Sequence, residues 1–431
     1  MKQGTYETGS GEREKAVLVS LVTDAARRSG ADPVHSMEEL ASLAETAGVD
    51  VLDAVMQNLD VPDNRYLVGK GKAREVRLLA EEKGATTAIF DQELSGAQVR
   101  NLEELLDMKI IDRTQLILDI FAGRAKTREG ILQVELAQLS YLLPRLSGHG
   151  KNLSRLGGGI GTRGPGETKL ETDRRHIRRR ITELKRQLEA VAAHRGLHRE
   201  RRRKVGALQV ALVGYTNAGK STLLRRLTDA DVLAEDKLFA TLDPTSRGLA
   251  LPSGKEIVLT DTVGFIQNLP HDLVAAFRAT LEEAAHADLL LHVVDSSSPM
   301  RDRQMQVVDE VLRELGAGGK PTLLVYNKAD LATPEGAIAP ADGADSIRVN
   351  AYDERDLARL VQAIEDRVLG EIARFRIPAA RGDLAALAYR VGEVTDRKAE
   401  DDWLVLSVRL HPADMEKSGR VLEAYRLGES D

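Results

Sequence analysis

The segment VALVGYTNAGKSTLLRRL, residues 210–227, sets the class of fold expected for this chain. A short apolar run leads into a glycine turn, and the turn leads into a segment with a helical pattern. The turn has the spacing G-x4-G-K-S, in which backbone N–H groups surround phosphate at the N-terminus of a helix. In this pattern Lys220 reaches the outer phosphates and the Ser221 hydroxyl ligates Mg²⁺. The segment therefore predicts a phosphate-binding loop between a strand and a helix.

Strand-like apolar runs recur on both sides of this loop, each followed by a helical segment. They read LQVALVG, EIVLTDTVG, ADLLLHVVDSS, PTLLVYNKAD and SIRVNAY, between residues 208 and 352. Continuous apolar strands of this kind are typical of a parallel sheet buried on both faces. The sequence predicts an α/β domain with a parallel-sheet core over residues 205–370.

Two further motifs indicate which nucleotide the loop binds. The motif DTVG, residues 261–264, supplies the Asp261 carboxylate for the magnesium shell and a Gly264 N–H for the γ-phosphate. The motif NKAD, residues 327–330, supplies the Asp330 carboxylate, which can accept from guanine N1–H and from its 2-amino group. Adenine offers only an acceptor at N1, and two facing acceptors in a dry site cost several kcal/mol. The pattern favours GTP over ATP.

The segment FATLDPTSR, residues 239–247, lies between the first two motifs. We expect Thr241 to complete the magnesium coordination when a γ-phosphate is present. Thr245 is an alternative, and so is a plain turn capped by Asp243 and Pro244.

The predicted site residues follow from these motifs. Nucleotide contacts are predicted for Gly214, Tyr215, Thr216, Asn217, Ala218, Gly219, Lys220, Ser221, Thr222, Phe239, Ala240, Thr241, Leu242, Asp243, Asp261, Thr262, Val263, Gly264, Asn327, Lys328, Asp330, Asn350 and Ala351. Lys220, Thr241 and Gly264 are the predicted catalytic residues. Ser221 and Thr241 are the predicted Mg²⁺ ligands, and Asp261 is predicted to hold the ion through its bound water. The stem of Lys328 would cover the base, Asn327 would brace the loop, and Asn350-Ala351 would meet the base O6.

Two positions bear on the hydrolysis mechanism. Phe265 stands where many GTPases have a water-orienting glutamine, so intrinsic hydrolysis should be slow unless a partner completes the site. An ordinary packing role for Phe265 is compatible with this interpretation. Asn217 is either a K⁺ ligand or a loop-stabilising amide.

The chain before the nucleotide domain divides into two parts. Residues 1–125 predict a small α/β domain with strands at AVLVSLVT, TTAIFDQEL and MKIIDRT, and a helix that Ser36 opens as its N-cap. The segment YLVGKGKAREV, residues 66–76, is an alternative second phosphate loop, although it lacks the P-loop spacing. Residues 126–204 carry two series of apolar residues spaced 4, 3, 4, 3, beginning at Leu132 and Ile177. These series predict an antiparallel helical hairpin with the glycine-rich stretch RLGGGIGTRGPG at its tip.

The basic charge of the chain is concentrated in this hairpin. The whole chain has a net charge of −6, yet residues 145–204 hold 18 Lys and Arg against 6 Asp and Glu. Such a block can bind a phosphate backbone, and a charged face that only meets solvent is the alternative. Residues 371–431 predict a small α+β domain, with Trp403 in its core.

Composition excludes several classes of protein. The chain has no cysteine, so a disulfide, a thiolate metal site and a thiol nucleophile are excluded. No apolar run reaches the length of a membrane span, and the first residues lack the apolar region of a signal peptide. We expect a cytoplasmic monomer, with peripheral association with a membrane surface as an alternative.

The motifs GYTNAGKSTL, FATLDPT, DTVGFI and NKAD, preceded by RLGGGIGTRGPGETKLETDRRHIRRRI, resemble the HflX family of ribosome-associated GTPases. The resemblance spans nearly the whole chain and implies a GTPase that uses Mg²⁺, binds the large ribosomal subunit and its rRNA, and separates stalled ribosomes during stress. It also implies RNA contacts by Arg163, Lys169, Arg174 and Arg175. A GTP-controlled switch on another RNA or a membrane surface remains an alternative. A tRNA-modification GTPase is another, although such chains usually carry a cysteine.

Overall fold

The computed structural model describes residues 13–28, 30, 32–146, 165–204, 208–228, 237–268, 283–331, 345–410 and 420–427. These residues fall into two compact units. The first unit is made of Met1–His198, Glu235–Asp243 and Gln267–Thr280, and the second of Arg199–Ala234, Pro244–Ile266 and Leu281–Asp431. Two short segments on either side of the DTVG motif therefore group with the N-terminal part of the chain.

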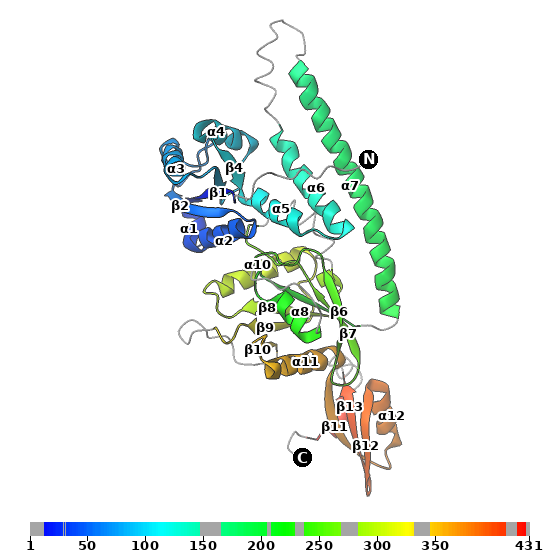
Figure 1. Ribbon diagram of the computed structural model, residues 1–431. Helices are drawn as coiled ribbons and strands as arrows, with labels where there is room; N and C mark the ends of the chain where they lie inside the picture. Colours follow the sequence, from blue (N-terminus) through cyan, green and yellow to red (C-terminus); the bar gives the residue numbers. More distant parts are fainter. Residues whose placement is uncertain are drawn as a thin grey trace. The chain divides into compact units, whose positions relative to one another are not determined.

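The first unit contains a parallel four-stranded sheet with the order β2-β1-β3-β4. Its strands are β1 (Lys15–Val22), β2 (Asp50–Asn58), β3 (Thr87–Phe90) and β4 (Lys109–Asp112). Its helices are α1 (Asp24–Arg28), α2 (Pro33–Thr46), α3 (Lys70–Lys83), α4 (Gly96–Leu106) and α5 (Arg113–Arg124) (Figure 1). Strands β1, β3 and β4 lie where the sequence predicts them, and β2 is a strand that the sequence reading missed.

Helix α2 begins earlier than the sequence predicts. Its N-cap is Asp32, whose carboxylate accepts from the amides of Val34 and His35, and Pro33 occupies the first turn. Proline fits there because its missing N–H would have no intrahelical partner. The prediction of Ser36 as the cap is wrong. The Ser36 hydroxyl instead donates to Asp91 at 2.8 Å.

The helical hairpin consists of α6 (Arg128–Arg145) and α7 (Pro165–Lys204). Leu132, Leu136 and Leu184 form its buried centre, with Leu139, Ile181 and Leu188 packed against them. Arg180 of α7 pairs with Glu135 of α6, and Arg195 pairs with Glu129. Positions rise along α6 as they fall along α7, so the two helices run antiparallel, as predicted.

The second unit is built on a six-stranded sheet with the order β10-β9-β8-β5-β7-β6. Its strands are β5 (Gln209–Gly214), β6 (Thr245–Ala250), β7 (Glu256–Asp261), β8 (Leu289–Asp295), β9 (Thr322–Asn327) and β10 (Ser346–Arg348). All neighbouring pairs are parallel except β6 with β7. Helices α8 (Lys220–Thr228) and α11 (Glu354–Leu369) share one buried cluster with the sheet, and α10 (Arg301–Glu314) contacts β5 and β8. The predicted α/β class with a parallel core is confirmed.

The C-terminal part of the second unit is an antiparallel three-stranded sheet, β11-β13-β12. Its elements are β11 (Glu371–Pro378), α12 (Gly382–Val391), β12 (Glu393–Glu400), β13 (Trp403–Leu410) and a short α14 (Arg420–Glu423). Along β13, Leu406 and Val408 join the core with Phe375, whereas Trp403 is 37% exposed. The prediction of Trp403 in the core is wrong, because successive side chains of a strand point to opposite faces and Trp403 lies on the outer one.

No helix among the described residues combines the length and the apolar character that crossing a bilayer requires.

Candidate nucleotide site

The G-x4-G-K-S loop joins the end of β5 to the start of α8, as the strand-turn-helix pattern predicts. The Lys220 ammonium is buried and donates to the carbonyls of Gly214 at 3.0 Å and Tyr215 at 2.8 Å. Gly219 has φ of +98°, and a Cβ there would overlap the side-chain amide of Asn327. That amide donates to the Ala218 carbonyl at 2.9 Å. Asn327 of the NKAD motif therefore braces the loop.

The DTVG motif lies directly beside the loop. The Ser221 hydroxyl donates to the Asp261 carboxylate at 2.7 Å. The Thr216 amide donates to the Phe265 carbonyl at 2.7 Å, and the Phe265 amide donates to the Gly214 carbonyl at 3.1 Å. A Cβ on Gly264 would lie 2.7 Å from the Thr216 Cα and 3.1 Å from the Lys220 Nζ. Only glycine brings this backbone so close to the lysine.

Burial controls the charge state of Lys220. Loss of hydration lowers its pKa from 10.5 to about 8, while the nearby Asp261 carboxylate acts in the opposite direction. Without a phosphate to neutralise it, the ammonium is a buried charge whose ionisation is disfavoured. A nearby anionic ligand would favour the charged form and raise the pKa of Lys220 again, so the loop is suited to bind an anion.

His292, on β8, is a neighbour of this site that the sequence reading missed. It is 2% exposed, and burial followed by repulsion from Lys220 lowers its pKa to about 4. The imidazole is therefore neutral at physiological pH and adds no charge to the site. Its position inside an apolar strand, LLLHVVD, was the only signal available in the sequence.

The end of β9 carries the predicted base-binding residues. Lys328 has φ of +57°, and its ammonium pairs with Asp295 at 2.7 Å. Asp330 lies in the turn after β9 with its side chain exposed. Asp295, at the end of β8, was not predicted, and its ion pair fixes the lysine stem proposed to cover the base.

The neighbouring Asn350-Ala351 segment is held by local bonds. The Asn350 backbone amide donates to the Asp356 carboxylate at 2.8 Å. The Asn350 side-chain oxygen accepts from the Tyr352 amide at 2.9 Å. Ala351 is buried. The predicted contact of this segment with the base stays a prediction.

The described part of the FATLDPTSR segment divides between the two units. Phe239, Ala240, Thr241, Leu242 and Asp243 belong to the first unit, whereas Ser221 and Asp261 belong to the second. Thr245, the alternative magnesium ligand, is the first residue of β6 and pairs with Asp261 across the strands. Other predicted contacts lie in the second unit: Thr222 is in α8, Val263 and Thr262 are buried, and Thr262 donates to the Leu212 carbonyl.

Phe265 is 1% exposed and belongs to the buried interior. Its ring therefore packs, which agrees with the packing role considered for it, and no polar side chain at this position can orient a water. Asn217 has φ of +60°, a left-handed conformation that asparagine tolerates.

The predicted RNA contacts are only partly covered by the described residues. Arg163 lies outside the described residues, and Lys169 lies in α7. Arg174 is half-buried and Arg175 is exposed on the same helix.

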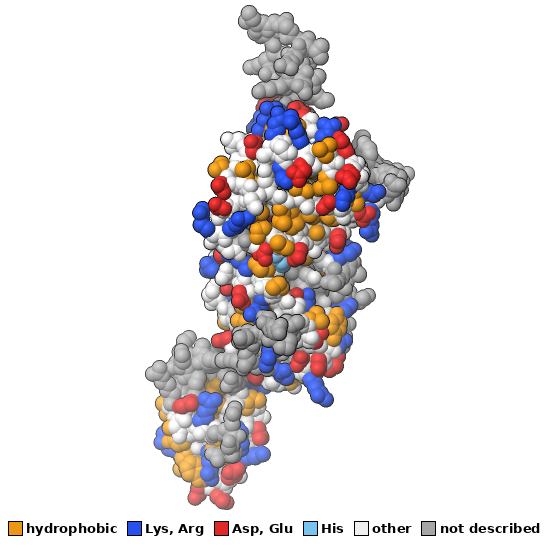
Figure 2. Space-filling model, turned by 90° about the vertical axis from the view of Figure 1, so that its left-hand side faces the viewer, with side chains coloured by type: hydrophobic (Ala, Val, Ile, Leu, Met, Phe, Trp, Pro, Cys, Tyr) orange, Lys and Arg blue, Asp and Glu red, His pale blue; other side chains and the backbone are white. Residues whose placement is uncertain are grey.

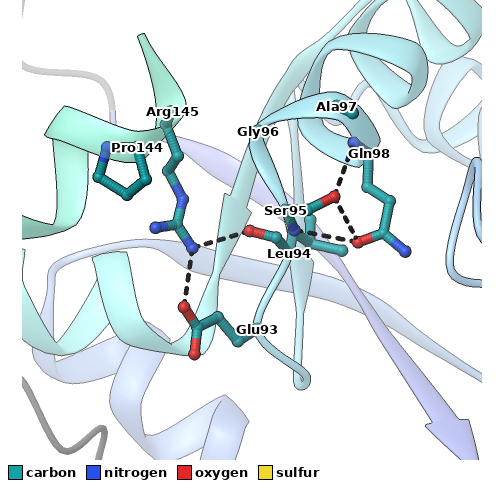
Figure 3. A pocket seen from close by; sticks show the side chains of 8 residues that line it. All are labelled: Glu93, Leu94, Ser95, Gly96, Ala97, Gln98, Pro144 and Arg145. Atoms are coloured by element: carbon teal, nitrogen blue, oxygen red, sulfur yellow. Dashed lines mark hydrogen bonds and ion pairs between the residues drawn. The ribbon is translucent and has the colours of Figure 1, made fainter. Parts of the chain in front are cut away.

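A pocket of about 640 Å³ opens in the first unit between the start of α4 and the end of α6 (Figure 3). Arg145 fills one side and donates to Glu93 at 3.0 Å and to the Leu94 carbonyl at 2.7 Å. Across from it, Ser95 and Gln98 cap α4 reciprocally. The Arg145 guanidinium and the Ser95–Gln98 pair thus have protein partners, although the Arg145 Nε has none among the described residues. The separate segment proposed as a second phosphate loop leads into α3, where the Gly69 amide donates to the Gln57 side chain.

The strand-turn-helix loop with Lys220, the adjoining DTVG motif and the bracing Asn327 define a P-loop GTPase. Three family models match the chain: GTP-binding GTPase N-terminal over residues 34–122, GTP-binding GTPase Middle Region over 124–202, and 50S ribosome-binding GTPase over 209–328. The curated GTPase HflX of Alkalihalophilus pseudofirmus is 56% identical over 82% of this chain and 84% of its own length. The GTPase HflX of Escherichia coli is 44% identical over 95% of each chain. The chain belongs to the HflX family of GTPases, and it is an enzyme that hydrolyses GTP.

Among solved structures, one similar chain is a GTP-binding protein from Sulfolobus solfataricus in complex with GDP. It is 26% identical, with a TM-score of 0.43, over 82% of this chain and 98% of that chain.

Proposed function

We propose that this GTPase binds the large ribosomal subunit and its rRNA in the GTP state and separates stalled ribosomes during stress, acting as a cytoplasmic monomer. The observation that carries the proposal is the long basic helix α7, joined to a G domain whose family model is described as a 50S ribosome-binding GTPase. The two features together indicate a nucleotide-controlled arm for a polyanionic partner.

Helix α7 is suited to a phosphate backbone by its length and its unpaired cations. Its 40 residues extend for about 60 Å at 1.5 Å per residue. Some of its arginines are neutralised, since Arg180 pairs with Glu135 and Arg186 with Glu183. Arg175, Arg179 and Lys185 are exposed and form no ion pair with another described residue.

The face of the molecule shown in Figure 2 offers a contrast to this helix. On the face shown in Figure 2, Lys and Arg side chains are mixed with Asp and Glu side chains over most of the described residues. A mixed surface gives little long-range attraction for phosphate. Binding to RNA would therefore depend on the hairpin, and increasing salt concentration would weaken it.

The site residues fit a magnesium ion. Ser221 and Asp261 are already paired at 2.7 Å, and both offer the oxygen ligands that Mg²⁺ prefers. We propose that Ser221 ligates the ion directly, that Asp261 binds it through its water shell, and that Thr241 joins them in the GTP state. The ion would neutralise charge on the β- and γ-phosphates.

We propose separate roles for the other residues of the site. Lys220 would bind the outer phosphates and Gly264 would donate its N–H to the γ-phosphate. Asp330 would select guanine, since its carboxylate can accept two guanine donors. With Phe265 buried, water positioning would depend on the partner, so we propose slow hydrolysis that ribosomes stimulate. The K⁺ role of Asn217 would appear as a faster rate in KCl than in NaCl at equal ionic strength.

Sedimentation of ribosomes tests this function directly. Intact 70S ribosomes are incubated with the protein and a GTP analogue, with GDP, or with the Lys220→Met variant, and are resolved on sucrose gradients. The proposal requires a shift from 70S particles to separated subunits with the GTP analogue only. Unchanged 70S peaks under all three conditions would overturn it.

A further inference from the structure

The first unit contains a contact between Phe239–Asp243, the part of the predicted FATLDPTSR segment that belongs to this unit and here called the switch segment, and the start of the hairpin. The Asp243 carboxylate accepts from the amides of Lys126 and Thr127, each at 2.9 Å, and from the Thr127 hydroxyl. Thr127 is itself the N-cap of α6 and accepts from the Gly130 amide. Asp243, more than 100 residues along the chain, therefore holds the two residues directly before α6, one of which is its N-cap.

Helix geometry favours a carboxylate at this position. The helix dipole concentrates partial positive charge at the N-terminus of α6, next to the two amides from which Asp243 accepts. Gly130 leaves the space that the carboxylate occupies, because a Cβ on this residue would overlap the Asp243 Oδ1. The contact therefore needs both a carboxylate at position 243 and a residue without a side chain at position 130.

An aromatic contact anchors the other end of the same segment. Phe239 is 2% exposed, and its ring meets the ring of Phe121 on α5 edge to face, with centroids 4.8 Å apart. Phe239 has φ of +53°, which is strained for a bulky side chain. Such strain persists only while the surroundings impose it, and it is concentrated at switch regions.

A second contact links the segment that follows DTVGFI to the same unit. The Gln267 side chain donates to the Ser36 hydroxyl at 3.4 Å. Ser36 in turn donates to Asp91, which is paired with the buried Arg113. Both segments that flank the phosphate motifs are thus attached to the N-terminal part of the chain.

We propose that Asp243 is a positioning residue that latches the switch segment onto the N-terminus of α6 in the GDP-bound protein, and that GTP binding releases this latch. The proposal rests on the proposed role of Thr241 as a magnesium ligand. Thr241 lies two residues from each of the two anchors, Phe239 and Asp243, so a new contact of Thr241 in the GTP state would be transmitted to both. Release of Phe239 would also relieve the strain at that residue. The start of the hairpin then loses its contact with Asp243, so the hairpin senses the nucleotide.

Amide hydrogen exchange on the full-length protein tests the latch, because the Lys126 and Thr127 amides are its donors. In the wild type we expect both amides to exchange slowly with GDP and about tenfold faster with a GTP analogue, the factor that loss of one charge-assisted bond allows. Asp243→Ala should give fast exchange with both nucleotides. Equal exchange with both nucleotides in the wild type would overturn the proposal, as would a difference that persists in Asp243→Ala.

Two further variants separate positioning from mere stability. Gly130→Ala places a methyl group where the carboxylate sits, yet alanine favours a helix, so we expect fast exchange at Lys126 and Thr127 without loss of helix content. Asp32→Ala is the matched control, since Asp32 caps α2 of the same unit through two amides. It should leave the nucleotide dependence unchanged. Slow exchange in Gly130→Ala, or loss of the dependence in Asp32→Ala, would contradict the proposal.

The ratio of the affinities for a GTP analogue and for GDP is a measurement that would not change if Asp243 only stabilised the fold. Because coupling between two sites is reciprocal, releasing the latch should favour the GTP analogue over GDP. We expect the ratio of the two affinities to rise by about tenfold in Asp243→Ala, and an unchanged ratio would refute the coupling. None of these measurements needs ribosomes, so ribosome binding can fail independently. Thr241→Ala, assayed for Mg²⁺-dependent binding of the GTP analogue, tests the magnesium role by itself.

Discussion

Replacing Lys220 with methionine should change how the stability of the nucleotide-free protein depends on pH. Burial lowers the lysine pKa from 10.5 to about 8, a difference that corresponds to about 3 kcal/mol. Between these two pH values the unfolded chain binds a proton that the folded chain has lost. Stability of the wild type therefore rises with pH through this window, and the charged lysine is a cost below pH 8.

The magnitude follows from this window. The free energy of unfolding of the wild type, relative to Lys220→Met, should rise by about 2 to 3 kcal/mol between pH 7 and pH 10. The lysine also donates two hydrogen bonds to loop carbonyls, worth about 1 kcal/mol each, which the variant loses at every pH. That loss shifts the difference by a constant and leaves its slope unchanged. At pH 7 we expect the variant to be no less stable than the wild type.

Urea unfolding of both proteins across this pH range, without nucleotide, measures the difference. Lys255→Met removes an exposed lysine that pairs with Glu393 and corrects for the general effect of losing a positive charge. GDP should raise the midpoint of the wild type and leave that of Lys220→Met unchanged, because the phosphate partner is gone. A stability difference that stays flat from pH 7 to pH 10 would refute the reasoning.

Three other substitutions have defined outcomes. Asp330→Asn replaces one of the two acceptor oxygens with an NH2 donor that would face a guanine donor, and it should weaken GTP binding by roughly 100-fold in calorimetry, with unchanged ATP binding as the internal control. Gly219→Ala has to fit a Cβ where the Asn327 amide lies, at a φ of +98°, and should abolish GDP binding in the same assay. Leu184→Ala empties the fully buried centre of the hairpin beside Leu132 and should lower the free energy of unfolding by about 2 to 5 kcal/mol in urea titrations. Full GDP binding by Gly219→Ala, or wild-type stability of Leu184→Ala, would show that the packing described at these positions is not essential.

The sequence predicted those parts of the fold whose signal is local. The loop from Gly214 to Ser221 could be predicted because its residues have a fixed spacing between a strand and a helix. The hairpin could be predicted because its apolar residues recur every 3 to 4 positions, since only one face of each helix is buried. The strands β2 and β6 were missed. Strand β2 is half-exposed, with a burial pattern that lacks the continuous apolar run of its neighbours, and β6 has mostly exposed side chains.

Contacts between distant residues could not be predicted in this way. Lys328 pairs with Asp295, 33 positions away, and Asp243 accepts from the Lys126 amide, 117 positions away. Neither contact has a spacing that a motif could reveal. Trp403 was misplaced for a different reason. Hydrophobicity alone favours burial, but the pleat of β13 assigns that residue to the outer face of a three-stranded sheet.

Association with purified large ribosomal subunits tests the central claim most directly. The wild type and an Arg175→Glu/Arg179→Glu variant are sedimented with the subunits in the presence of a GTP analogue or GDP, over a series of salt concentrations. We expect the wild type to pellet with the GTP analogue and not with GDP, and the variant to pellet less at every salt concentration. Equal pelleting of the wild type with both nucleotides, or pelleting of the variant at the level of the wild type, would contradict the account.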